Sequence, residues 1–226
     1  MILGCTGPGI FAGDTLRQSI RVASGARVVL ASQSALQVHP GAAAAPASIA
    51  HDYVVEGDGE LHCQWDPVIP FALARLEQRF DIHLAGSSRL CWGDAIMAGR
   101  VRRGEAWRFE SLSHELRLNI AGVLTYLERY VLAPSERPVA HRWLAGEARY
   151  LATALVHHEG ATADAAEALQ AAAREGANAG VDLIGPATIV ARIMAHDGAP
   201  FARARAAVLT QTQAAIFGTP SRTTRK

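Results

Sequence analysis

The segment RLEQRFDIHL, residues Arg75–Leu84, alternates between apolar and polar side chains. Four apolar residues, Leu76, Phe80, Ile82 and Leu84, share one set of alternate positions. The other set is charged, and it comprises Arg75, Glu77, Arg79, Asp81 and His83. A period of two residues is typical of a β-strand with one buried face. Similar alternation runs from Thr15 to Leu132, so we expect a mainly β fold.

Pairs of short strands recur along this part of the chain, and each pair is joined by a turn that contains glycine. The turns lie at Ser24-Gly25, Gly57-Asp58-Gly59, Gly86-Ser87 and Ala121-Gly122. Glycine supplies the positive φ that tight hairpins require. Because the turns are about 30 residues apart, we expect hairpins stacked into a β-helix-like, solenoid-like structure. A β-sandwich remains the alternative.

The pattern changes after Pro134, where helical segments appear between strands. Nine of the residues from Ala161 to Ala177 are alanine, which predicts a helix with Thr162 as its N-cap. A second helix is expected from Asp197 to Gly218. With strands at 149–157 and 187–195, the order is β-α-β-α. We therefore expect one domain built from a stacked β region (1–134) and a β-α-β-α region (135–218), followed by a frayed tail (219–226).

Composition narrows the function class. Of the 226 residues 50% are hydrophobic and 19% charged, which excludes an intrinsically disordered chain. Lys+Arg number 22 against 21 Asp+Glu, so no nucleic-acid partner is expected. The longest stretch without formal charge, Val28–Ala50, contains prolines and glutamines, so no membrane span or targeting signal is expected. Three widely spaced cysteines favour a reducing cytoplasm.

Motifs for catalysis and tight cofactor binding are missing. Gly7–Ala12 matches G-x-G-x-x-[GA], but it lacks the preceding strand and following helix of a nucleotide loop. No Walker A, G-x-S-x-G or HExxH sequence occurs, which favours a protein that is not an enzyme. Cys5 and His39 are weak candidates for a transient metal ligand. The basic run Arg100–Arg103 is either an exposed loop or a docking patch for an acidic partner.

Several segments, in this order, resemble the urease accessory protein family called UreD (UreH in some bacteria). They are Gly7–Asp14, Gly25–Arg27 with Ser32–Ala35, Asp66–Ala72 followed by Arg75 and Gln78-Arg79, Trp92–Phe109, Leu127–Pro134 and Ile189–Arg192. Each segment is weak alone, but together they cover nearly the whole chain in register. Within them the resemblance offers these partner-binding or family-motif candidates: Gly13, Asp14, Gln33, Asp66, Pro67, Pro70, Arg100, Arg103, Gly104 and Glu105.

The resemblance implies a β-helix-like fold with a small helical part, and a role as a non-catalytic cytoplasmic assembly factor. Such a factor binds apo-urease subunits, recruits UreF-like partners and a UreG-like GTPase, and helps deliver nickel. It implies no tightly bound cofactor, only weak and exchangeable nickel. Two departures stand out: Met1 lies almost on the glycine motif, and Gln37 replaces an expected basic residue. If strands before this motif are missing, we expect an exposed sheet edge.

Two other functions remain open at this point. One is a generic β-solenoid binding module with no metal role. The other is a β-solenoid enzyme that acts on a polysaccharide, which would require paired carboxylates converging in a groove. The outward positions of the expected strands are mixed Arg, Glu, His and Ser, and this mixture disfavours the enzyme.

Overall fold

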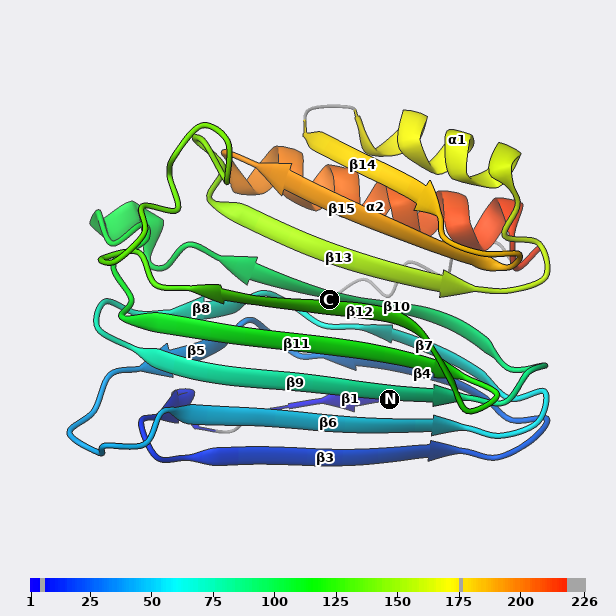
Figure 1. Cartoon of the computed structure of the whole chain (residues 1–226), viewed down its shortest axis with the longest axis horizontal. Coiled ribbons are helices and arrows are strands. Elements are labelled where there is room, and N and C mark those ends of the chain that lie inside the picture. The colour runs from blue at the N-terminus through cyan, green and yellow to red at the C-terminus, as the bar shows by residue number, and fades with distance from the viewer. Residues whose placement is uncertain (5–6, 175–176, 219–226) are drawn as a thin grey trace.

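The computed structural model describes residues 1–4, 7–174 and 177–218, and it shows two β-sheets with two helices beside the larger one (Figure 1). Sheet A consists of β1 (Ile2–Leu3), β2 (Ile10–Phe11), β4 (Arg27–Ser32), β5 (Leu36–His39), β7 (Glu60–Gln64), β8 (Val68–Pro70), β10 (Arg89–Met97), β13 (Tyr150–His157), β14 (Asn178–Leu183) and β15 (Thr188–Ala195). Sheet B consists of β3 (Thr15–Val22), β6 (Ala47–Val55), β9 (Arg75–Leu84), β11 (Ser111–Ile120) and β12 (Val123–Leu132). The helices are the short 3-10 helix η1 (Val101–Arg103), α1 (Ala163–Ala173) and α2 (Gly198–Ala215).

The mainly β, solenoid-like class is confirmed, but three of the four expected hairpins are wrong. The strands on either side of each of the first three turns lie in different sheets. Strand β3 pairs in parallel with β6, with Leu16 opposite Ile49, whereas β4 pairs in parallel with β7. These turns are therefore corners between the sheets. Only the turn at Ala121-Gly122 forms a hairpin, because β11 and β12 pair antiparallel within sheet B.

The corners stack on one another through side chains of short polar residues. The carboxylate of Asp58 accepts hydrogen bonds from the Ser24 hydroxyl and the Gly25 amide, both at 2.7 Å. One rung later, the Ser88 hydroxyl donates to the carbonyls of Val55 and Gly57 at 2.8 and 2.9 Å. Each corner is thus hydrogen-bonded to the corner of the preceding rung. The parallel strands that leave the corners keep the same spacing.

The core between the sheets is built from the inward-facing residues of successive rungs. Tyr53, Ile82, Trp92 and Leu118 are among its fully buried side chains. The burial pattern of β9 follows the alternation read from the sequence, apart from Asp81, which is buried although it lies on the outward row. Apolar burial of this kind is the main stabilising contribution to such a fold.

Sheet A continues past sheet B through its C-terminal strands. Strand β13 pairs antiparallel with β10 along eight residue pairs, and β15 and then β14 extend the sheet (Figure 1). The expected order β-α-β-α is therefore incomplete, because β14 adds a strand between the helices. The sequence of β14, NAGVDL, is short and half polar, so its pattern did not predict a strand.

Both predicted helices are present, and they cover the outer face of the C-terminal strands. The hydroxyl of Thr162 accepts a hydrogen bond from the Ala165 amide at 3.2 Å, as expected of an N-cap. Small side chains such as Ala166 and Ala204 let the helices approach the sheet closely. No helix among the described residues is long and apolar enough to cross a membrane. The tail at 219–226 lies outside the described residues.

Candidate functional site

A cavity of about 600 Å³ lies where sheet A extends beyond the last strand of sheet B. Strand β12 forms one wall, the inner side of β13, β15 and β14 forms another, and the segment after β12 contributes Val139 and 143–145. Its polar lining consists of Asp94, Glu128, Tyr130, Thr153, Asn178 and Arg192. The remaining lining is largely apolar, so the few polar groups determine what the cavity can bind.

Asp94 reaches the cavity because β10 alternates. Leu90, Trp92, Asp94 and Ile96 occupy its inward-facing positions, so a carboxyl group stands in an otherwise apolar row. Its side chain is almost wholly buried. Burial, together with the nearby negative charge of Glu128, raises the pKa of Asp94 to about 7. This carboxyl group therefore exchanges a proton near neutral pH.

Glu128 stands opposite on β12 and is held by three neighbours. Its carboxylate accepts a hydrogen bond from the Tyr126 hydroxyl at 2.9 Å and another from the Thr153 hydroxyl at 3.3 Å. The guanidinium of Arg192 lies 3.2 Å from the same oxygen. Burial, and after it the neighbouring Glu128, raises the pKa of Tyr126. The cavity thus holds two carboxyl groups, Glu128 with three side-chain partners and Asp94 with a pKa raised by burial.

A strip of polar side chains leads from the cavity into the space between the sheets. Gln18 lies beside His51 in the register of β3 and β6, and Gln78 lies beside His114 in that of β9 and β11. Within the described part of the chain, each of the four keeps one buried polar atom without a hydrogen-bond partner: Gln18 Oε1, His51 Nε2, Gln78 Oε1 and His114 Nε2. Such atoms cost roughly 1–3 kcal/mol each unless water or another polar group reaches them.

His114 connects this strip to the cavity. Its ring stacks on that of Tyr130 with 4.7 Å between the ring centroids, and Tyr130 lines the cavity. Its Nδ1 lies 3.9 Å from a carboxylate oxygen of Asp94. Burial lowers the pKa of both His114 and His51 to about 4, so both are neutral at pH 7. His114 thus joins the cavity wall to the buried polar pairs, and the ring of Phe80 lies between His114 and His51.

Comparison with known proteins gives the family of the chain. The model of the family described as UreD urease accessory protein matches residues 1–226. The chain belongs to the UreD family. It is 33% identical over 165 residues to "Urease accessory protein UreD" of Sorangium cellulosum, covering 73% of this chain and 51% of that protein. It is 30% identical over 145 residues to the protein of the same name from Lysinibacillus sphaericus, covering 63% of this chain and 53% of the other. The chain spans about half the length of these curated relatives.

One group of the residues singled out by the UreD resemblance forms a compact loop after β10. Arg100 makes a two-pronged ion pair with Glu105, and its guanidinium lies 4.0 Å from the ring centroid of Phe71. Gly104 ends η1 with a φ of +73°. Pro70 is adjacent, because its carbonyl closely approaches Gly99. Arg103 is exposed on the same loop.

The other family-motif candidates lie in turns. The carboxylate of Asp14 accepts a hydrogen bond from the Phe11 amide at 2.8 Å, and Gly13 has a φ of +88°. Asp66 pairs with the Ser32 hydroxyl, and the Pro67 carbonyl receives the Leu36 amide. Gln33 is exposed after β4. None of these residues lines the cavity described above.

Of the two metal candidates from the sequence, the structure describes only His39. Cys5 lies outside the described residues. His39 bonds through Nε2 to the Pro8 carbonyl at 2.9 Å and stacks on Phe11. Among the described residues, no group of three or more His, Cys, Asp or Glu is placed to hold a metal ion.

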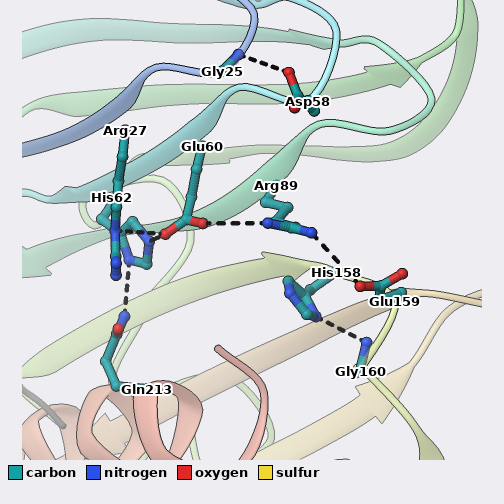
Figure 2. Close-up of polar contacts among 10 residues, drawn as sticks. All are labelled: Gly25, Arg27, Asp58, Glu60, His62, Arg89, His158, Glu159, Gly160 and Gln213. Carbon is teal, nitrogen blue, oxygen red and sulfur yellow. Dashed lines mark hydrogen bonds and ion pairs between the residues drawn. The ribbon is translucent and has the colours of Figure 1, made fainter. Parts of the chain in front are cut away.

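A second polar cluster lies on the outer face of sheet A, where the end of α2 meets the solenoid (Figure 2). His62 is bonded to Glu60 through Nε2 and to the Gln213 amide through Nδ1, the latter at 2.8 Å. Arg27 and Arg89 also contact Glu60. Burial is the largest influence on the pKa of His62 and lowers it. Because its ring atoms already have protein partners, this cluster fastens the helix to the solenoid.

Sequence reasoning missed the residues that define the cavity, Asp94, Glu128 and Arg192. They are far apart in the chain and come together only because β10, β12 and β15 converge. Two local signals pointed to them: an acid inside the apolar run of β10, and another at an inward position of β12. The segments that carry the UreD resemblance include all three residues, but the resemblance does not say which side chains face inward.

Proposed function

We propose that this chain is a non-catalytic scaffold for urease maturation that acts in the cytoplasm. In this role it binds apo-urease and recruits UreF-like and UreG-like partners. Membership in a family of urease accessory proteins supports the role in maturation. The rigid stack of rungs, held corner to corner, suits a scaffold because its surfaces keep a fixed relation to one another.

Nickel is the cargo in this proposal, and the cavity is its point of passage. The observation that carries the proposal is the pair Asp94 and Glu128 at the mouth of the polar strip. Oxygen and imidazole groups bind divalent nickel. Because Glu128 is already engaged by Arg192, the ion would be held weakly and released. We expect no nickel to remain bound after dialysis.

The decisive test is urease activation in a host that carries apo-urease and its other accessory genes but lacks its own UreD protein. Expression of this chain should restore urease activity and the nickel content of urease when nickel is supplied. Co-purification of the chain with apo-urease tests scaffold binding separately. A folded, expressed chain that restores neither activity nor nickel content would contradict the proposal.

Glu128→Gln tests the cavity. It keeps the shape of the side chain but removes the charge that faces Asp94, so we expect urease nickel content to fall severalfold while apo-urease still co-purifies. Glu167→Gln, an exposed acid on α1, is the matched control and should behave as the unchanged chain. Equal nickel content in the two variants would exclude passage through the cavity.

A second candidate, a polysaccharide-acting enzyme, draws support from the same two carboxylates. Such chemistry needs one acid and one available carboxylate on either side of a sugar. Here Glu128 is occupied by Tyr126, Thr153 and Arg192, which disfavours it as a nucleophile or base. Release of reducing sugars from plant or bacterial polysaccharides, lost in Glu128→Gln, would support this alternative.

A further inference from the structure

The free edge of β12 differs from the other free edge of sheet B. Strand β12 ends the strand order and, among the described residues, pairs only with β11. Its outward-facing side chains Leu127 and Val131 are 44% and 65% exposed. The opposite edge, β3, instead presents Arg17 and Arg21 outward, which is the usual protection of an exposed edge. The outward row of β12 carries a single arginine, Arg129, between these two apolar residues, and a free edge of ten residues is a template for strand pairing.

The fold restricts what can pair with β12. Sheet A extends past this edge through β13, β15 and β14, and together with β12 these strands enclose the cavity (Figure 1). A second copy that paired edge to edge would bring its own extension of sheet A into the same layer. The two extensions would then meet in that layer, which disfavours a second copy as the occupant. A single extended segment can lie beside β12 and above β13.

The outer face of sheet B specifies the charge of that segment. One row across the sheet reads Arg79, Glu115, Arg129 in register, with alternating signs. The Nε of Arg129 lies 2.6 Å from a Glu115 carboxylate oxygen, and its side chain remains 56% exposed. On a strand added beside β12, the residue opposite Arg129 would continue this row, and an acidic residue is favoured there. The residues opposite Leu127 and Val131 are favoured to be apolar.

We infer that the β12 edge is a docking site for an extended segment of a partner protein whose outward side chains read apolar, acidic, apolar. The segment adds a strand to sheet B and covers the mouth of the cavity. Its backbone supplies hydrogen bonds to the edge, and its alternate side chains supply selectivity. This inference rests on the geometry of β12 and stands or falls independently of whether the chain activates urease.

The probes are two synthetic peptides that differ only at the central residue, TVTETVT and TVTKTVT. Fluorescence anisotropy of labelled peptides should show that the glutamate peptide binds about threefold to tenfold more tightly, the range expected for cross-strand charge pairs. Hydrogen exchange should slow at amides within 123–132 when the glutamate peptide is added. Amides of β3 should not change.

Arg129→Glu reverses the charge that the peptide meets and should reverse the preference toward the lysine peptide. The matched control is Arg117→Glu, which also removes a contact of Glu115 but lies on β11, one strand from the edge. It should keep the preference for glutamate. Circular dichroism establishes that both variants are folded before binding is compared.

Any one of the following results would overturn the inference. Neither peptide binds the folded chain, or the two peptides bind with equal affinity. Protection appears on β3 rather than on β12. Protection of β12 rises with protein concentration when no peptide is present, which would make a second copy the occupant.

Discussion

Three titratable residues between the sheets give the stability of the protein two opposing dependences on pH. His51 and His114 have a pKa of about 4 in the folded protein, below the ordinary 6.5. Their contribution to stability is complete above about pH 6.5 and is lost as the pH falls through about 4. Asp94, with its pKa raised from 3.8 to about 7, acts in the opposite sense. Its contribution is complete below about pH 3.8 and is lost as the pH rises through about 7.

We therefore predict that single substitutions change the slope of stability against pH in opposite directions. His114→Gln should reduce the loss of unfolding free energy between about pH 6.5 and pH 4, by at most about 3 kcal/mol. Asp94→Asn should increase that loss, because the compensating carboxyl group is removed. Urea unfolding at a series of pH values measures both. His83→Gln, exposed on the outer face of β9, is the control and should leave the slope unchanged.

The same residues show where sequence reasoning stops. The apolar character of β10 can be recognised in the sequence, yet a lone acid in an apolar strand does not disclose its partner. The partner Glu128 lies on β12, on the other sheet, and only the lateral extension of sheet A brings the two into one cavity. The orphaned atoms of Gln18 and His51 likewise depend on the pairing of β3 with β6.

Among the elements, the corner turns carry the regularity of the solenoid. Gly57 has a φ of +51°, and a Cβ placed on it would lie 2.3 Å from the Ser24 hydroxyl oxygen in the corner below. Glycine is therefore needed here both for its backbone conformation and for the close approach of two rungs. A side chain at this position would push the two corners further apart than the paired strands that they connect.

Gly57→Ala should consequently lower the free energy of unfolding by about 1–3 kcal/mol, the usual cost of a left-handed non-glycine residue. Chemical denaturation measures the change. Gly185→Ala is the matched control, because that glycine has no positive φ and no atom within 4 Å of the added carbon, so its effect should be small. Equal stability of the two variants would contradict the role given to the corner.

Element positions were largely predictable from the sequence, but their pairing was not. A glycine turn between two alternating strands looks the same in the sequence whether it closes a hairpin or turns a corner, because glycine adopts a positive φ in both, at Gly25 and Gly57 in corners and at Gly122 in the hairpin. A corner differs from a hairpin in which strands pair: β3 pairs with β6, about 30 residues further along the chain, and not with the strand that directly follows it. The local sequence does not indicate this pairing. The helix after Thr162 was predictable because its N-cap and alanine-rich pattern act locally.

For the whole molecule, the continuous sheet A links the solenoid to the helical part. Eight consecutive residue pairs join β10 to β13, so separating the two parts would expose two strand edges at once. Gln213 adds a side-chain contact from α2 back to His62 (Figure 2). We infer that the two parts lose their structure together.

We thus expect one cooperative unfolding transition. All four tryptophans lie at or before Trp143, so their fluorescence reports the solenoid and its adjoining loop, whereas the helical circular dichroism signal reports α1 and α2. The two midpoints in guanidinium chloride should coincide. Separate midpoints would show that the helical part unfolds on its own and would contradict the coupling.

The parallel pairing of strands from successive rungs has a consequence for synthesis on the ribosome. Each rung pairs with one completed shortly before it, so the growing polypeptide can settle rung by rung as it emerges. Strand β13 is different, because it pairs with β10 and more than fifty residues separate the two strands in the chain. Until those residues have been translated, the edge of β10 that will pair with β13 has no partner strand. During that interval the nascent chain is most open to misassembly, and a folding chaperone would be of greatest use there.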